Sequence, residues 1–515
     1  MKSMLNAKYI ITEQMYNDYC ENYTVVPVLK RSTFKEDVLS ILDSNTLDVF
    51  NDKYQLLLHS PKGGRYSFLA VKNSSYFTGK PDGLYIDRVT EDNIHKQEFI
   101  SGNPLQLLEQ VFSQYCAPTI ECAPDFYGGL IGYFGYDIVR LLENIPDTAH
   151  NDIDLPLYFF GLVTDGIAID HKEQQMYIYA NKTAKESYRE LVGRIEEIEA
   201  TISKMIESSI RNGEHVHGEL VDEELIEDAN KPSSVNGDYS CDIDEAVATF
   251  TEGEFCNAVD RIIDYIKAGD VFQVNLSVRH GIQTNKNPYE IYRTLVNNNP
   301  SPYMAYIHTP EFAIASSSPE LLVKVKDQLV ETRPIAGTRS RGSNEEQETA
   351  LINDLLSNEK ELAEHIMLVD LERNDLGRIC EYGSVTVNEL FTLEKYSHVI
   401  HLVSNVRGKL RADKNLFDVI RAVFPGGTIT GAPKVRTMEI IEELEPVKRG
   451  LYTGSIGWIG FQHEMEFNIA IRTAIIKDNW AYVQAGAGIV YDSIPKREYK
   501  ESLKKARAVW EAIRG

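Results

Sequence analysis

One stretch of this 515-residue chain has too few apolar side chains to belong to a hydrophobic core, and it separates the rest into two parts. Residues 211–249 are acidic and rich in turn-forming residues, as in solvated connecting segments. The chain is also longer than a single core usually allows, so two tightly packed domains are expected. The sequence therefore predicts an N-terminal domain over residues 1–210, an acidic linker over residues 211–249 and a second domain over residues 250–515.

Both parts contain runs of strands with helices between them. Residues 251–267 have helical apolar spacing and end at Gly269, which is typical of a C-terminal cap. Residues 271–279 alternate like a strand, with Phe272 and Val274 on one face and Gln273 and Asn275 on the other. The order favours an α+β fold over a regular parallel α/β fold. Further helices are predicted over residues 186–210, 346–370, 416–423, 434–443 and 497–514, and further strands include 157–163, 166–170, 303–308, 399–409 and 467–476.

Composition excludes several classes of protein. The net charge of −24 argues against a general nucleic-acid binder, although local arginines could still bind an anionic substrate. None of the six cysteines forms a CxxC pair, so free thiols in a reducing cytoplasm are expected. No signal peptide is recognised at the N-terminus, and no run of about 18 apolar residues could span a membrane. His215 and His217 form an HxH pair, which is more often solvated than metal-bound.

Acidic residues at helical spacing are the first candidates for chemistry. Glu361, Glu364 and His365 share one helix face, and Glu498 and Glu501 are three residues apart near the C-terminus. Carboxylates are suitable ligands for Mg²⁺, which takes one or two of them together with water and substrate oxygens. The alternative is a solvated acidic helix face.

Several loop and strand residues could bind an anion. The segment FPGGTITGAPK (424–434) lacks the Lys-Ser/Thr pair of a P-loop, but its amides could face a carboxylate or simply form a turn. Arg472 lies between apolar residues, so it needs either a ligand carboxylate or an internal salt bridge. His398 and His401 could act as bases near neutral pH or be ordinary core histidines.

Taken together, these segments resemble the chorismate-utilising enzymes, most closely the component I subunits of anthranilate synthase. The matching segments are SSSPELLVK (316–324), RPIAGTRSRG (333–342), EHIMLVDLERNDLGR (364–378), HVIHLVS (398–404), GGTITGAPK (426–434), AIRTA (470–474) and QAGAGIV (484–490). The N-terminal half contributes GGRYSF (63–68), a glycine-rich strand near residue 128, and NPSPYM (299–304). The resemblance implies layered β-sheets with flanking helices and a substrate cleft between the layers.

The resemblance also implies a reaction and a set of site residues. Ammonia would add at C2 of chorismate as the C4 hydroxyl leaves, and elimination of pyruvate would then give anthranilate. Glu320 matches the general acid and His401 the histidine of the elimination step, with Gln273 and Thr428 in the same catalytic set. Glu364 and Glu501 match the Mg²⁺ ligands, with Glu361 and Glu498 one turn away. The matching substrate-binding positions are Gly337, Thr338, Tyr452, Arg472, Gly486, Ala487, Gly488 and Lys505.

Two positions bear on the product. Isochorismate- and salicylate-forming relatives have a lysine where this chain has Gln273, and an amide cannot act as the base for water. Aminodeoxychorismate synthases typically have a lysine where this chain has Ala336, and a methyl group cannot form the adduct attributed to that lysine. Both residues indicate anthranilate, with aminodeoxychorismate synthase component I as the alternative.

The resemblance further implies a partner and an inhibitor. No glutaminase segment is visible, so ammonia would come from a separate glutamine amidotransferase subunit, in an expected heterotetramer, or from free ammonium. Ser60, Pro302, Tyr303 and Met304 match the feedback site for tryptophan. The usual LLES segment there is LLHS in this chain, so His59 replaces the acid.

Overall fold

The computed structural model describes residues 8–34, 53–89, 95–211, 246–342, 344–395 and 399–515. Most of the predicted linker, including His215 and His217, lies outside these residues, as does His398. The division into two domains therefore stays a prediction. None of the helices in the described residues is long and apolar enough to cross a membrane.

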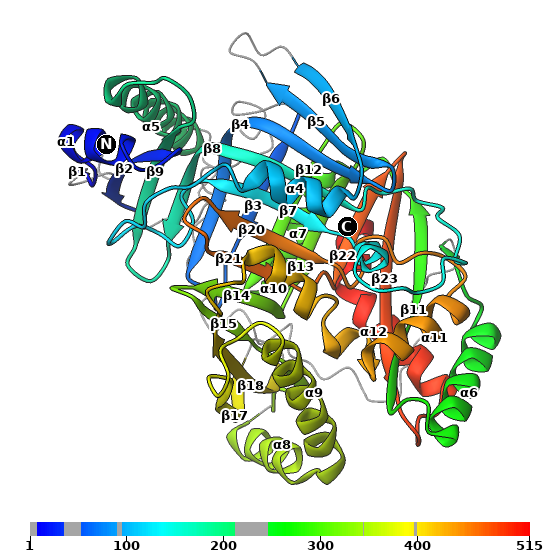
Figure 1. Cartoon of the computed structure of the whole chain (residues 1–515). Helices are drawn as coiled ribbons and strands as arrows, with labels where there is room; N and C mark the ends of the chain where they lie inside the picture. Colours follow the sequence, from blue (N-terminus) through cyan, green and yellow to red (C-terminus); the bar gives the residue numbers. More distant parts are fainter. Residues whose placement is uncertain (1–7, 35–52, 90–94, 212–245, 343, 396–398) are drawn as a thin grey trace.

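Antiparallel strands form the body of the molecule, and those of the two halves pair directly with each other (Figure 1). Strand β3 pairs with β12, with His59 opposite Met304, and β7 pairs with β20. The strands of the N-terminal half are β1 (Lys8–Tyr9), β2 (Val26–Thr33), β3 (Gln55–His59), β4 (Tyr66–Lys80), β5 (Gly83–Val89), β6 (His95–Ser101), β7 (Gly129–Phe134), β8 (Tyr158–Asp170) and β9 (Gln175–Lys182). Those of the C-terminal half are β10 (Val247–Ala248), β11 (Gln273–Gln283), β12 (Tyr303–His308), β13 (Ala313–Ser318), β14 (Leu321–Lys326), β15 (Leu329–Thr332), β16 (Ile335–Ser340), β17 (Thr386–Lys395), β18 (Val399–Lys409), β19 (Gly431–Ala432), β20 (Ser455–Gly460), β21 (Met465–Asn468), β22 (Thr473–Lys477) and β23 (Trp480–Ile489).

Helices cover the sheet on its outside. Helices α8 and α9 lie beside β16, and α9 also lies beside β18, at one end of the molecule, whereas α5 lies beside β2 and β9 at the other (Figure 1). The helices are α1 (Glu13–Cys20), α4 (Pro104–Phe112), α5 (Tyr188–Arg211), α6 (Glu252–Ala268), α7 (Pro288–Asn298), α8 (Glu345–Ser357), α9 (Glu359–Gly377), α10 (Leu416–Val423), α11 (Lys434–Leu444) and α12 (Pro495–Arg514), with the 3₁₀ turns η1 (Tyr136–Leu141) and η3 (Gly427–Ile429). The predicted α+β class with flanking helices is confirmed.

Local signals in the sequence account for several element boundaries. Thr251 and Glu254 form a capping box at the start of α6, and Gly269 ends the helix in the left-handed region at φ 83°. Strand β18 and helix α10 have the predicted bounds.

Four predicted elements, in three regions of the chain, were wrong in their extent. The two strands predicted at 157–170 are one strand, β8. The helix predicted over 346–370 is two helices, because Asn358 leaves the helical conformation and its side chain accepts a hydrogen bond from Glu361 at the start of α9. The strand predicted over 467–476 is interrupted, because Arg472 adopts φ 51° between β21 and β22.

The cores determine which faces of the strands remain free for chemistry. Val274, Leu276 and Ala487 pack in one apolar cluster with α6, so the opposite face of β11 and β23 carries Gln273 and Gly488. Phe272 was predicted on the apolar face, but it precedes the strand and is 69% exposed. The described cysteines are free thiols, as predicted.

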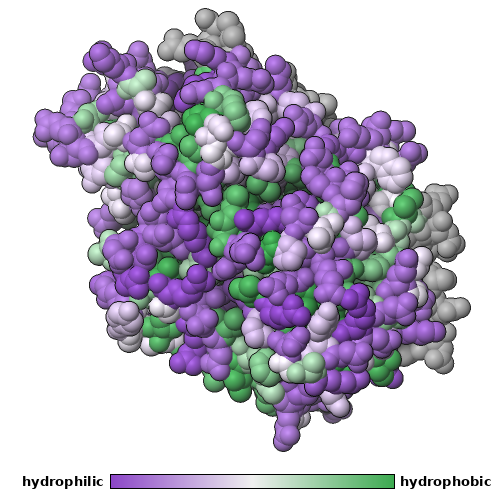
Figure 2. Space-filling model, turned by 45° about the vertical axis from the view of Figure 1, so that its right-hand side comes forward, coloured by the Kyte–Doolittle hydropathy of each residue, from purple (hydrophilic) through white to green (hydrophobic). Residues whose placement is uncertain are grey.

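Polar residues dominate one face of the molecule. The face in Figure 2 is mostly hydrophilic, with hydrophobic residues visible between the polar ones towards its centre. Exposed apolar side chains scattered in this way are normal on the surface of folded proteins.

Candidate active site

Glu320 is a buried carboxylic acid between β13 and β14. Burial raises its pKa to about 7, although Thr428, the Ile335 backbone and the charges of Arg472 and Lys505 favour the ionised form. Its Oε1 atom and the Thr428 hydroxyl are buried without a hydrogen-bond partner among the described residues. A carboxyl group with this pKa can hold a proton near neutral pH and donate it to a ligand.

Arg472 provides a positive charge beside Glu320. Burial lowers the pKa of its guanidinium, and the nearby Glu320 acts in the opposite direction. Within the described part of the chain, no carboxylate lies close enough to form an ion pair with Arg472. The internal salt bridge considered from the sequence is therefore not observed there, and the guanidinium is available for a ligand carboxylate.

His401 lies on β18 close to both Arg472 and the glycine of the IAGT segment. Burial lowers the pKa of its imidazole to about 4, and the positive charge of Arg472 lowers it further, while Glu394 and the Gly337 backbone act in the opposite direction. Thr338 is opposite His401 in the β16–β18 ladder, but its side chain lies outside the described atoms. His401 is thus neutral at pH 7 and able to accept a proton.

Gln273 lies against the glycine-rich end of β23. A Cβ atom at Gly488 would come within 2.5 Å of the Gln273 amide nitrogen, and one at Gly486 within 2.7 Å of Asn275 Oδ1. The amide of Gln273 also favours the ionised form of Glu364. Neither position has room for a Cβ atom, so the two glycines let the strand lie directly against Gln273 and Asn275. Ala487 faces the opposite way into the apolar core, so only its backbone can reach this site.

The acidic faces of α9 and α12 converge on the same lysines. Burial raises the pKa of Glu364 and of Glu498, and the positive charges of Lys360 and Lys505 oppose both shifts. Lys505 lies 2.9 Å from Glu501 and donates to the Gly486 carbonyl at 3.2 Å. Carboxylates from both helices thus lie near the same two lysines, which the spacing along the sequence could not show.

These carboxylates fit a magnesium ion that is completed by its substrate. Within the described residues, no three His, Cys, Asp or Glu side chains are close enough to hold a metal by themselves. Mg²⁺ does not require such a cage, because it takes one or two protein carboxylates and completes its shell with water and substrate oxygens. Glu364 is only partly buried, and a cation would offset the desolvation that raises its pKa. Glu361 is instead paired with Arg339 at 2.7 Å.

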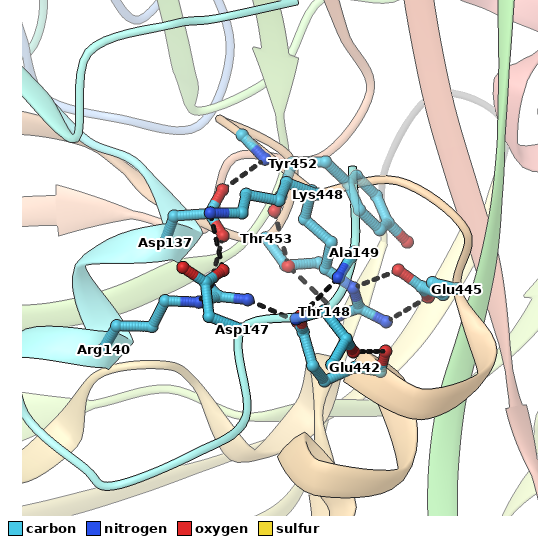
Figure 3. A network of polar contacts seen from close by, with 12 residues as sticks. Asp137, Arg140, Asp147, Thr148, Ala149, Glu442, Glu445, Lys448, Tyr452 and Thr453 are labelled. Carbon is cyan, nitrogen blue, oxygen red and sulfur yellow. Dashed lines mark hydrogen bonds and ion pairs between the residues drawn. The ribbon is translucent and has the colours of Figure 1, made fainter. Parts of the chain in front are cut away.

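Tyr452 lies in a polar network that the sequence did not reveal, in which Arg449 lies over the Tyr452 ring and pairs with Glu445 (Figure 3). Arg140 forms ion pairs with Asp137 and Glu442, and Glu442 also accepts the backbone N–H groups of Thr148 and Ala149. These contacts hold the segment after β7 against α11 (Figure 3). The spacing of Glu445 and Arg449 was the available signal, since i,i+4 charges often pair, but the sequence does not show that this pair is buried.

Three of the predicted inhibitor residues line a pocket that does not include Glu320. Pro302, Tyr303 and Met304 line it, whereas Ser60 lies behind it and donates to the Pro302 carbonyl at 2.5 Å. The remaining lining residues are Leu58, His59, Tyr66, Phe68, Ile456, Gly457, Trp458, Glu466 and Asn468. The sequence had not assigned most of them, because they come from four separate strands.

Comparison with known proteins identifies the family. The pattern of the chorismate binding enzymes matches residues 85–511. The chain belongs to this family. It is therefore a chorismate-utilising enzyme, and the arrangement around Glu320 and Arg472 is its candidate active site.

Named relatives come from two activities within this family. Aminodeoxychorismate synthase component 1 of Bacillus subtilis (strain 168) is 46% identical over 490 residues, which cover 95% of this chain and 97% of the relative. Anthranilate synthase component 1 of Acetivibrio thermocellus is 41% identical over 467 residues and 89% of each chain. The crystal structure of anthranilate synthase component I from Streptococcus pneumoniae TIGR4 has a TM-score of 0.70 and 32% identity, covering 91% of this chain and 97% of that one.

The pKa of Glu320 leads to a prediction about stability. The unfolded chain releases this proton near the ordinary value of 4.5 and the folded chain near 7, so the free energy of unfolding falls as the pH rises through this window. Glu320→Gln removes the free-energy cost of ionising this buried carboxyl group. We expect it to stabilise the protein by about 2 kcal/mol more at pH 8 than at pH 5.5, measured by urea unfolding. An equal effect at both pH values would show that the pKa is not raised.

Proposed function

We propose that this chain is the chorismate-binding subunit of an anthranilate synthase. The observation that carries the proposal is the buried acid Glu320, with a pKa near 7, beside an Arg472 without a carboxylate partner among the described residues. A dicarboxylate with a poor leaving group needs a cation to bind it and an acid to protonate the group that departs. Glu320 and Arg472 supply these two functions at one place.

In the proposed reaction, each residue has a limited task. Arg472 binds a carboxylate of chorismate, and Glu320 donates its proton to the C4 oxygen, which leaves as water while ammonia forms the new bond at C2. His401 is neutral at pH 7 and can accept a proton. It acts in the second step, in which the C2 proton is lost and the enolpyruvyl group leaves as pyruvate. Thr428 can donate its unpaired hydroxyl to the substrate or to Glu320. A bound Mg²⁺ would neutralise a substrate carboxylate, and Glu364 and Glu501 would hold it.

Two residues favour anthranilate over other products. Gln273 is buried beside Gly488 and has no basic group, so it cannot activate water as a lysine would. Ala336 presents only a methyl group in β16, so no amine is available there for a covalent adduct. Tyr452, Lys505, Gly337 and the backbone of the 486–488 segment complete the proposed substrate site.

Formation of aminodeoxychorismate is the second candidate. The 46% identity with the Bacillus subtilis synthase over 95% of the chain favours it. The two candidates share the binding of chorismate and differ in the position of the new C–N bond and in whether pyruvate is eliminated. Analysis of the product therefore separates them.

We predict that the purified chain converts chorismate to anthranilate when Mg²⁺ and ammonium are present. Anthranilate fluorescence and mass spectrometry of the products provide the measurement. Glutamine in place of ammonium serves as the control, and it should not support the reaction, because ammonia is proposed to come from a separate subunit. Aminodeoxychorismate as the product would establish the second candidate, and unchanged chorismate would leave only a non-catalytic role.

The proposed ammonia source is a glutamine amidotransferase subunit, and the proposed assembly is a heterotetramer. The motifs of the C-terminal half account for most of residues 250–510 and leave no segment there for a glutaminase. Adding an amidotransferase subunit should make glutamine an effective donor, which the assay above can detect.

Magnesium dependence gives a second prediction. Glu364→Gln and Glu501→Gln should each raise the Mg²⁺ concentration for half-maximal chorismate consumption by at least about tenfold, because each removes a charged ligand. Glu511→Gln is the matched control, since Glu511 lies on the same α12 but pairs with Arg507 near its C-terminal end. An unchanged Mg²⁺ requirement in the first two variants would show that the ion is held elsewhere.

Tryptophan is the proposed inhibitor, and the aromatic pocket beside β12 is its proposed site. Ser60→Ala removes the hydrogen bond that holds the Pro302 carbonyl, so we expect tryptophan to inhibit about tenfold more weakly in this variant. Ser32→Ala is the control, because Ser32 is a buried serine on β2 that does not line this pocket. Inhibition curves for chorismate consumption give the result, and equal inhibition of both variants would place the inhibitor elsewhere.

A further inference from the structure

Arg449 is a buried arginine whose guanidinium is fully engaged by four separate segments. It donates to Glu445 Oε2 at 2.9 Å and Oε1 at 2.7 Å, and to the Asn275 carbonyl at 2.7 Å. It also donates to the Ile429 carbonyl and to the Thr453 hydroxyl, both at 3.2 Å. Its side chain is 1% exposed and lies over the rings of Tyr136 and Tyr452. Arg449 is thus enclosed by protein and is not placed to touch a substrate.

The segments that Arg449 joins carry proposed substrate-site residues. Ile429 follows Thr428, and Thr453 follows Tyr452. Asn275 is two residues after Gln273 and is opposite Gly488 in the β11–β23 ladder. One planar group therefore fixes the distances between three parts of the site.

Glu445 connects the same hydrogen-bond network to a fourth part of the site, the strand that carries Gly486. Its Oε1 accepts the backbone N–H of Ser277 at 2.9 Å and the Ser277 hydroxyl at 2.7 Å. Ser277 is opposite Gly486, whose carbonyl accepts from Lys505. The ion pair therefore also sets the position of the strand that carries Gly486 and Gly488.

Stability alone does not explain why two charged residues, Arg449 and Glu445, are buried here. Two charges removed from water cost more to bury than a well-packed apolar pair, so buried ion pairs are weak contributors to folding. An arginine fork, however, sets directions as well as distances, which neither lysine nor an apolar side chain does. Thr453, which accepts one of these bonds, has a left-handed backbone at φ 60°, a conformation that surrounding contacts must maintain.

We propose that the Arg449–Glu445 ion pair is a positioning device for chorismate binding, which holds Tyr452, Thr428 and the glycine strand β23 in register. The inference rests on the proposed function only in assigning these residues to the chorismate site. It does not depend on whether the product is anthranilate or aminodeoxychorismate.

Binding of chorismate to the full chain tests the proposal directly. Arg449→Lys keeps the charge and loses the fork, and Glu445→Gln keeps the shape and loses the charge. Isothermal titration with chorismate and Mg²⁺, without ammonium, gives the dissociation constant and the binding-competent fraction separately. We expect each variant to bind at least about tenfold more weakly, the factor that one lost hydrogen bond to a charged group can bring.

Arg194→Lys is the matched control. Arg194 is a partly buried arginine, with its side chain 20% exposed, and it likewise donates to a carboxylate, Asp165, at 2.6 Å and to a backbone carbonyl, that of Asn181, at 2.9 Å. It joins α5 to β8 and β9, at the end of the molecule opposite α8 and α9 (Figure 1). Its variant should lose thermal stability and keep the dissociation constant of the unsubstituted chain.

The outcomes separate the inference from the proposed function. A purely structural ion pair would lower the melting temperature and the competent fraction of the Arg449 and Glu445 variants without changing the dissociation constant, and that result would overturn the inference. If Arg449→Lys does not fold, the milder Glu445→Gln decides by the same criterion. Normal chorismate binding without any amination product would contradict the proposed function and leave the inference standing. Failure of the unsubstituted chain to bind chorismate would overturn both.

Discussion

Direct pairing between strands of the two halves is the constraint on which the rest of the structure depends. Because β3 pairs with β12 and β7 with β20, the N-terminal half supplies one side of the sheet on which the catalytic residues are placed. Backbone hydrogen bonds fix the register of such pairs, and a slip of one residue would turn every side chain to the other face. The aromatic pocket beside β12 exists only because His59 and Met304 meet in this register.

Burial then determines the protonation of the candidate active site. The pKa of Glu320 rises to about 7, that of His401 falls to about 4 and that of Arg472 falls, and desolvation is the main cause in each case. The shifts of Glu320 and His401 favour their neutral forms, whereas the guanidinium of Arg472 stays charged near neutral pH, so the site suits a ligand that brings a carboxylate. A dicarboxylate and a divalent cation together are such a ligand.

Some boundaries of helices and strands could be predicted from the sequence, and others could not. The capping box at Thr251, the cap at Gly269 and the bounds of α10 were predictable, since each depends on a few neighbouring residues. The break between β21 and β22 was not, because Arg472 has a left-handed backbone and its carbonyl accepts the N–H of Ser317, on the distant strand β13. Likewise, the resemblance identified Glu320 and His401, but it did not identify the Arg449–Glu445 pair behind them.

The sequence by itself determined the α+β class and the family, and it predicted the residues proposed as acid, base and metal ligands, because these follow from local patterns and matching motifs. Only the tertiary structure decided which of them meet and in what state of charge. It brings the acidic faces of α9 and α12 to shared lysines and leaves Arg472 without an ion-pair partner in the described residues. The reason is that desolvation and contact depend on packing between segments hundreds of residues apart, which spacing along the chain does not specify.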